Sequence, residues 1–452
     1  MSVKNWGIVA LHTIMLFLLF SVLFPLTFSA VSQPQNHKNR NPKTSDASSA
    51  VFQVEGNVYP LGHYTVSLSI GNPPKLYDFD IDSGSDLTWV QCDAPCQGCT
   101  KPPDQLYKPK NNLVQCGEEL CAGIHLSNEY QCAAPSDQCD YEVEYADQGS
   151  SLGVLVRDQI TLLYTNGSVV RPRIGFGCGY HQKYFGLNSP PSTAGVLGLG
   201  RGIVSFLSQL HALGLIRDVV GHCLSVKGGG FLFFGDDLIP SSGVVWIPMF
   251  PSSLEKHYSA GPAKLLFDGK LTSIKDLELI FDSGSSYTYL NSEAYQAIVD
   301  LISNDLKRQK LERAIDDDSL PICWKGAKPF KSLSEVKSYF KPLSLSFQKA
   351  NNLQFQLPPE SYLIITKHGN VCLGILDGTE VGLEKLNIIG DISLQDKIVI
   401  YDNENKKIGW MSANCDKLSV DREVEEGFPR RYATDSGIFS DRCPAIYGTT
   451  EK

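Results

Sequence analysis

The sequence lacks a basic stripe and, beyond its first thirty residues, any apolar run long enough to cross a bilayer. Acidic residues outnumber basic ones, 49 to 40, which gives a net charge of -9. Because phosphate binding needs a basic surface, nucleic acid is excluded as an expected partner. The C-terminus is polar, which excludes a glycolipid anchor signal there.

The one long apolar run follows Lys4 and extends from about Ile8 to Phe28. A positive start followed by an apolar stretch and small residues is typical of a signal peptide, expected here over residues 1–30. An uncleaved signal anchor is the alternative, because the run approaches the length of a membrane span. After signal removal no stable membrane span is expected, and the secretory pathway leads to an extracellular or vacuolar location.

The chain has 13 cysteines but no set of ligands typical of a zinc site. Cys96-Gln97-Gly98-Cys99 could begin a zinc or redox site, yet no matching His pair or second tight Cys pair completes it. In the oxidising secretory route the cysteines are better read as a disulfide framework. We expect no metal, a plausible Cys323–Cys372 pair, and Cys443 as the candidate unpaired thiol. Seven cysteines crowd into one stretch: Cys92, Cys96, Cys99, Cys116, Cys121, Cys132 and Cys139.

Two polar segments flank the predicted core. Residues 31–58 are expected to form a linker or short pro-segment, and residues 418–452 a polar tail. A hypothesis for the first segment is that its cations lie near acidic catalytic groups at neutral pH and are released in acid; a solvated linker is the alternative. These cations are Lys38, Arg40 and Lys43.

The core sequence favours strands and tight turns over long helices, as its 39 glycines and 25 prolines suggest. Two helices are expected, at about 292–311 and 205–213. Alternation of apolar and polar residues predicts a strand over 64–70, and strand-like patches recur in five further places: 77–81, 139–145, 154–163, 230–234 and 244–247. The protein is therefore expected to be mainly β.

A sequence repeat divides this core into halves. Phe79-Asp80-Ile81-Asp82-Ser83-Gly84-Ser85 returns 200 residues later as Leu279-Ile280-Phe281-Asp282-Ser283-Gly284-Ser285. Each copy is followed at a similar distance by two apolar residues and a glycine, ending at Gly198 and Gly390. The repeat predicts two like lobes, 59–241 with the Cys-rich insertion and 242–417, with a site between them.

The repeated motif suggests a definite chemistry. Asp-Ser-Gly-Ser after an apolar strand places a carboxylate on a tight turn, where glycine tolerates unusual backbone angles. If the lobes face each other, Asp82 and Asp282 share one site, and two close carboxylates cannot both ionise cheaply. Such a pair can activate water against a peptide carbonyl without metal or cofactor.

With these motifs the chain, over about residues 60–416, resembles pepsin-type aspartic proteases and most of all the plant nucellin-like group with its Cys-rich insertion. The resemblance implies a bilobal, pepsin-like acid protease fold of two β-rich lobes with an active-site cleft. It also implies polypeptide substrates, no cofactor and a monomer. Asp82 and Asp282 match the catalytic aspartates, Ser83 and Ser283 the inter-lobe hydrogen-bonding residues, and Ser85 and Ser285 the hydroxyls that support each carboxylate. Gly84 and Gly284 complete the two loops.

The resemblance further implies a flap, a β-hairpin that bears a tyrosine over the site. The segment around Tyr145 matches it, with Trp89 as the expected hydrogen-bonding partner, although Ala146 stands where glycine is frequent and Gln148 is additional. Each residue also has an ordinary structural interpretation. The two Asp-Ser-Gly segments could be turns, and both aromatic residues could be core packing.

Two other motifs point to different enzymes and are set aside. Gly149-Ser150-Ser151-Leu152-Gly153 fits the serine-hydrolase pattern, but a strand rather than a helix is expected after it. Gly198-Leu199-Gly200-Arg201-Gly202 misses the dinucleotide spacing. A more serious alternative is a catalytically silent binding or inhibitor protein on the same fold, since a fold alone does not fix a function. Asn166-Gly167-Ser168 is a glycosylation sequon and agrees with secretion.

Overall fold

The computed structural model of the protein describes residues 48–125, 132–184, 192–250, 256–383 and 386–416. These residues belong to one compact unit, 47–452. The predicted signal peptide, the three leader cations and the whole predicted tail, which includes Cys443, lie outside the described residues. Within the described residues, no helix is both long and apolar enough to cross a membrane.

The described chain is mainly β, as predicted. Its strands in the first half are β1 (Ala50–Asn57), β2 (His63–Ile70), β3 (Lys75–Asp82), β4 (Trp89–Gln91), β5 (Asp140–Glu144), β6 (Ser150–Leu163), β7 (Val169–Val170), β8 (Arg173–Lys183), β9 (Gly195–Gly198), β10 (Val219–Leu224) and β11 (Gly230–Phe234). Those in the second half are β12 (Val245–Pro248), β13 (Ser259–Phe267), β14 (Lys270–Leu271), β15 (Leu277–Phe281), β16 (Thr288–Leu290), β17 (Glu312–Arg313), β18 (Cys323–Lys325), β19 (Leu343–Phe347), β20 (Leu353–Leu357), β21 (Leu363–Ile365), β22 (Val371–Leu373), β23 (Ile375–Asp377), β24 (Asn387–Ile389), β25 (Lys397–Asp402) and β26 (Lys407–Ser412).

The helices are short. They are α2 (Glu119–Ile124), α3 (Phe206–Ala212), α4 (Ser292–Leu306), α5 (Leu333–Val336) and α6 (Asp391–Leu394), with 3-10 turns η1 (Gln348–Ala350), η2 (Pro359–Ser361) and η3 (Gly378–Val381). The predicted helix to Leu311 ends five residues earlier, at Leu306. Its apolar stripe stops there, because Gln309 and Lys310 continue the same face with polar groups.

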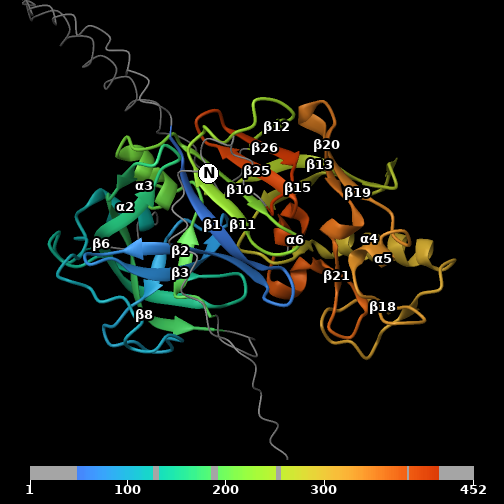
Figure 1. Ribbon diagram of the computed structural model, residues 1–452, viewed down its shortest axis with the longest axis horizontal. Helices are drawn as coiled ribbons and strands as arrows, with labels where there is room; N and C mark the ends of the chain where they lie inside the picture. The colour runs from blue at the N-terminus through green and yellow to red at the C-terminus, as the bar shows by residue number, and fades with distance from the viewer. Residues whose placement is uncertain (1–47, 126–131, 185–191, 251–255, 384–385, 417–452) are drawn as a thin grey trace, which may run out of the picture. The chain divides into compact units, whose positions relative to one another are not determined.

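One 14-stranded sheet joins the two halves of the sequence. Strand β10, before the predicted lobe boundary, pairs antiparallel with β25, which comes from the far end of the second half. In Figure 1, β2, β3, β6 and β8 lie to the left of these joining strands, and β18, β19 and β21 lie to the right. The two halves are thus connected by continuous backbone hydrogen bonding.

Strand β1 corrects the predicted boundary of the linker. Residues Ala50–Asn57 were placed in the polar segment 31–58, but they pair with both β2 and β11. Ala50 and Val54 are fully or almost fully buried. The sequence does not predict this strand because polar residues such as Gln53 and Glu55 lie between the buried ones. The two neighbouring strands that pair with its backbone come from distant parts of the chain and cannot be read from the local sequence.

The two lobes repeat the same arrangement around the two motifs, as the repeat predicts. In the first lobe β3 pairs in parallel with β9, and β4 pairs antiparallel with β9 and parallel with β8. In the second lobe β15 pairs in parallel with β24, and β16 pairs antiparallel with β24 and parallel with β23. The apolar-apolar-Gly segments therefore brace the strands that carry the two aspartates.

Six disulfides connect all twelve of the cysteines in the described residues. The Cys96–Cys99 bridge removes the thiolates that a zinc site would need, and the expected Cys323–Cys372 pair is confirmed. The remaining bridges are Cys92–Cys178, Cys116–Cys132, Cys121–Cys139 and Cys223–Cys415. This number of disulfides indicates an oxidising compartment and thus the secretory pathway.

Candidate active site

The two Asp-Ser-Gly-Ser segments form matching turns at the ends of β3 and β15. Each aspartate is held by its own turn: the N–H of Gly84 donates to Asp82 Oδ1 and that of Gly284 to Asp282 Oδ1, both at 2.8 Å. The hydroxyl of Ser285 donates to Asp282 Oδ2 at 2.7 Å, and that of Ser85 donates to Asp82 Oδ2. Both carboxyl groups therefore have fixed orientations before any substrate arrives.

Glycine is required in these turns by the approach of the opposite carboxyl group. A Cβ atom on Gly84 would lie 2.6 Å from Asp282 Oδ1, closer than van der Waals contact permits. A Cβ atom on Gly284 would likewise collide with Asp82 Oδ1. Each carboxyl group thus lies against the backbone of the other turn, which brings Asp82 and Asp282 together as the sequence predicts.

Ser83 and Ser283 bind the two turns to each other. The N–H of Ser83 donates to Ser283 Oγ at 3.1 Å, and the N–H of Ser283 donates to Ser83 Oγ at 2.9 Å. Each hydroxyl then donates across the lobe boundary to a strand carbonyl, Ser83 to Phe281 and Ser283 to Ile81, both at 3.1 Å. Both serines are almost fully buried, so these four bonds are shielded from water.

The environment of the pair favours a shared proton. Asp82 and Asp282 are each only 8% exposed. Burial, followed by the charge of Asp282, raises the pKa of Asp82 well above the ordinary carboxyl range. The hydrogen bonds from Ser85 and Gly84 oppose that rise in pKa. One proton is consequently retained on the pair at pH values where an isolated aspartate would be ionised.

The hairpin formed by β5 and β6 carries Tyr145 at its tip. The N–H of Tyr145 donates to the carbonyl of Gly149 at 2.9 Å, which closes the turn. Gln148 occupies it with a φ of 67°, a left-handed conformation that explains how the additional residue is accommodated. The Trp89 indole N–H donates to the Tyr145 hydroxyl at 2.6 Å.

Trp89 fits both the core-packing interpretation and the role of hydrogen-bonding partner to Tyr145. It is 5% exposed and belongs to a small core with Leu87, Val114 and Tyr141, and it also positions Tyr145. Burial and then the charge of Asp82 raise the pKa of Tyr145 far above its usual value. The tyrosine hydroxyl is therefore neutral, and it lies within electrostatic reach of Asp82.

Asp391 is a site residue that the sequence analysis missed. It follows Gly390 directly, begins α6, and donates its backbone N–H to the Ser285 carbonyl at 2.7 Å. Its side chain is 1% exposed, and its Oδ1 has no hydrogen-bond partner. Burial, Asp282 and Asp82 together raise its pKa strongly. The available signal was an acidic residue directly after an apolar-apolar-Gly motif.

The two motifs that were set aside have structural roles. Ser151 is fully buried in β6, where its hydroxyl is 3.0 Å from that of Tyr141, and no strand-to-helix turn follows it. In the Gly198–Gly202 segment, the Gly202 N–H donates to Asp86 Oδ1 at 2.7 Å. A carboxylate at that position would repel a phosphate group.

The described residues contain two clusters with metal-type ligands, Cys121 with His125 and Cys139, and Asp317 with Cys323 and Cys372. In both clusters the two cysteines are joined to each other as a disulfide, so neither offers thiolates. The sequon residue Asn166 is exposed in a turn, and its Oδ1 accepts the N–H of Ser168 at 2.9 Å.

Comparisons with known proteins agree on one family. The profiles described as Xylanase inhibitor N-terminal and C-terminal match residues 64–236 and 264–412. An aspartic proteinase of Oryza sativa subsp. japonica is 44% identical over 384 residues, covering 82% of this chain and 92% of the relative. Aspartic proteinase 39 of Arabidopsis thaliana is 29% identical over 382 residues, covering 80% and 76%.

Solved structures with the same fold are more distant in sequence. Basic 7S globulin from soybean superposes with a TM-score of 0.64 at 17% identity, covering 83% of this chain and all of the globulin. The aspartic proteinase from Irpex lacteus gives a TM-score of 0.57 at 15% identity, covering 81% and 98%. These likenesses show a mainly β, bilobal architecture.

Proposed function

This chain belongs to the pepsin-like aspartic protease family, and we propose from that membership and from its site that it is an active aspartic endopeptidase. The observation that carries the proposal is the pairing of Asp82 and Asp282 through matched turns, with one proton favoured on the pair. Two ordered carboxyl groups that share a proton supply a general base and a general acid at one site.

The proposed reaction uses only groups of this chain and water. The ionised carboxylate removes a proton from a water molecule as its oxygen attacks the peptide carbonyl carbon. The protonated carboxyl group donates to the carbonyl oxygen, which avoids an unstabilised oxyanion. Proton transfer to the amide nitrogen then allows the C–N bond to break, releasing a carboxylic acid and an amine. The two aspartates titrate as a unit, so the roles of ionised base and protonated acid are not assigned to particular residues.

The finer features of the proposal follow from the sequence. We place the chain in the nucellin-like group because of its cysteine-rich insertion between β4 and β6, closed by several disulfides. We also propose an acid-active, monomeric, glycosylated enzyme of the cell exterior or vacuole. The predicted signal peptide supports the location, the sequon at Asn166 supports the glycosylation, and a carboxyl pair that must keep one proton supports activity in acid. Polypeptides are the proposed substrates, with Tyr145 closing over them.

The test is proteolysis of a denatured protein at pH 3–7 by mature wild-type protein and by Asp82→Asn and Asp282→Asn variants. Wild-type cleavage that a hydroxyl-bearing transition-state peptide inhibitor blocks, and its loss in both variants, would support the proposal. Thermal melting of the variants checks that they remain folded. Undiminished cleavage by either folded variant would contradict the proposed role of that aspartate.

A binding or inhibitor protein is the second candidate function, favoured by the description of the matching family profiles as xylanase inhibitor regions. Two intact, mutually ordered carboxyl groups oppose it, because a binding protein has no need of a shared proton. Absence of inhibitor-sensitive cleavage by mature protein, together with inhibition of a xylanase, would favour this second function.

A further inference from the structure

The strand that leads to the active site carries three aspartates on one face. In β3, Tyr77, Phe79 and Ile81 are buried in the core, and Asp78, Asp80 and Asp82 point to the opposite side. Alternate residues of a strand are about 7 Å apart, so Asp80 lies one step from the proposed catalytic Asp82. It is an acidic group beside the reacting centre that the proposed reaction does not use.

The three carboxyl groups differ in their hydrogen-bond partners. Asp78 is exposed, and its Oδ1 accepts the hydroxyl of Ser67 at 2.6 Å. Asp82 is held by its own turn, as described above. Asp80 accepts the hydroxyl of Thr193 on Oδ2 at 2.7 Å, but its Oδ1 is buried and has no hydrogen-bond partner. A buried carboxylate oxygen without a donor is costly, and such groups are rare in folded proteins.

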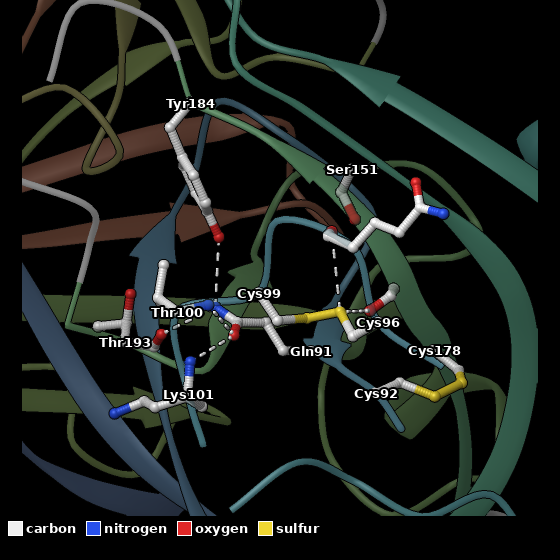
Figure 2. The surroundings of a disulfide bond; sticks show 12 residues. Gln91, Cys92, Cys96, Cys99, Thr100, Lys101, Ser151, Cys178, Tyr184 and Thr193 are labelled. Carbon is white, nitrogen blue, oxygen red and sulfur yellow. Dashed lines mark hydrogen bonds between the residues drawn. A yellow bond between two sulfur atoms is a disulfide. The ribbon is translucent and has the colours of Figure 1, made fainter. Parts of the chain in front are cut away.

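The wall beside Asp80 is polar and fixed. Gln91 donates through Nε2 to the Tyr184 hydroxyl at 3.3 Å and to the Thr193 carbonyl at 3.4 Å. Its Oε1 accepts the backbone N–H groups of Thr100 and Lys101 at 2.9 and 3.0 Å. Figure 2 shows this amide surrounded by the Tyr184, Thr100 and Thr193 side chains, next to the Cys96–Cys99 disulfide. The disulfide-closed loop thus fixes Gln91 and, through Thr193, the orientation of Asp80.

Asp80 also lies close to the flap tyrosine. Its charge contributes to the raised pKa of both Tyr145 and Tyr184, after the larger effect of burial. Asp80 is therefore within electrostatic reach of Tyr145 at the hairpin tip and of Tyr184, and it lies two residues before Asp82 on β3.

Asp80 forms no salt bridge with any of the described residues. Its cross-strand neighbour is Thr65, and the nearest basic group on that face is His63, two residues along β2. Burial raises the pKa of Asp80, and the charge of His63 and the hydrogen bond from Thr193 oppose that rise. The other charged groups nearby, Asp82 and Asp391, are acidic. Asp80 Oδ1 thus lacks a hydrogen-bond donor among the described residues, and a cation bound there would favour the ionised carboxylate against the effect of burial.

We propose that Asp80 is a specificity-determining residue that binds a lysine or arginine side chain flanking the scissile bond of the substrate. A basic side chain would supply both the missing donor and a positive charge at Oδ1, forming a charge-assisted hydrogen bond. An apolar side chain would leave that oxygen unsatisfied, and sites built for a polar group reject substrates that lack it. The proposal rests on the proposed endopeptidase function.

The test uses fluorogenic octapeptides whose reference version has Leu on both sides of one scissile bond. In the other versions one of these two residues is replaced by Lys or by Met. Met matches Lys in length but lacks its charge. Wild-type protein should cleave one Lys peptide with a kcat/KM about tenfold or more above that of the matching Met peptide. Asp80→Asn should bring this ratio close to one, and Asp80→Glu, which keeps the charge, should preserve most of it.

Asp78→Asn is the matched control, because it removes a carboxylate from the same strand face and should leave the Lys-to-Met ratio unchanged. A wild-type enzyme without preference for either Lys peptide would overturn the inference, whether or not the variants fold. So would an unchanged ratio in folded Asp80→Asn. If the wild-type protein cleaves the Met and Lys peptides equally well and the inhibitor blocks both reactions, only this inference is contradicted. If it cleaves no peptide at all, the proposed endopeptidase function is contradicted as well.

Discussion

Ser83 and Ser283, 200 residues apart, each donate a backbone N–H to the hydroxyl oxygen of the other. The exchange is symmetric, since each hydroxyl also donates to a strand carbonyl of the opposite lobe. It sets the distance between the neighbouring aspartates through short, buried contacts. The geometry of the proposed catalytic pair therefore depends on groups that take no part in the chemistry.

Replacing Ser83 with Ala should destabilise the protein by about 1–3 kcal/mol, because it leaves the buried Ser283 N–H without an acceptor. Ser83→Thr retains the hydroxyl and should cost less. Thermal melting, followed by urea unfolding where it is reversible, measures the difference. Ser334→Ala removes an exposed hydroxyl bonded only to Ser332 and should change stability by less than about 0.5 kcal/mol. Equal losses from the Ser83 and Ser334 Ala variants would contradict the assigned importance of the exchange.

The pH dependence of activity should have its alkaline limb above the ordinary carboxyl range, because burial and Asp282 raise the pKa of Asp82. Ser85→Ala removes a hydrogen bond that lowers this pKa, so the limb should move to higher pH. The profile of kcat/KM against pH measures the shift in the free enzyme. A limb that moves to lower pH in the Ala variant would show that the hydroxyl acts in another way.

Asp391 should make the folded protein less stable as pH rises. Its pKa is raised in the folded state, so the folded chain binds this proton more tightly than the unfolded chain. Its contribution is complete below the unfolded carboxyl pKa of about 3.9 and is lost as pH rises toward the folded value. Asp391→Asn should flatten the decline in melting temperature over that window. An identical decline in the variant would mean that other groups cause it.

Trp89→Phe and Tyr145→Phe remove the two ends of one hydrogen bond and should each lower kcat/KM by about tenfold, a loss equal to about 1.4 kcal/mol. The double variant should lose little more than either single variant, because the bond can be broken only once. Kinetics with one peptide substrate give the coupling energy. Fully additive losses would indicate that the two residues act separately, Trp89 through the core that it shares with Leu87 and Tyr141.

The disulfides allow a comparison between a long and a short closed loop. Cys223–Cys415 spans 192 residues and Cys96–Cys99 spans 3. In the chain-entropy account, removing the long bridge should cost about 3–4 kcal/mol more than removing the short one. Melting of the Cys223→Ala/Cys415→Ala and Cys96→Ser/Cys99→Ser double variants tests the order. Removal of the short bridge should instead alter substrate preference, because that loop holds Gln91.

Local patterns predicted much of the fold. Strand β2 follows from alternation of apolar and polar residues, and β3, β6 and β11 lie where the sequence has strand-like patches. Helix α3 begins where Ser205 accepts the N–H of Ser208. Strand β1 and the end of α4 could not be predicted in the same way. A half-polar segment becomes a strand when two neighbouring strands satisfy its backbone, and a helix ends when its neighbours leave no apolar surface to cover.

The sequence by itself determined that two Asp-Ser-Gly-Ser turns exist, that they end equivalent strands, and that the chain is mainly β, because these features depend on residue types at short spacing. Tertiary structure alone decided that Gly84 lies against Asp282, that Asp391 is buried beside the pair, and that Asp80 has an unsatisfied oxygen. The reason is physical. Burial, missing hydrogen-bond partners and the electric field of distant residues arise only when segments far apart in the chain exclude water together.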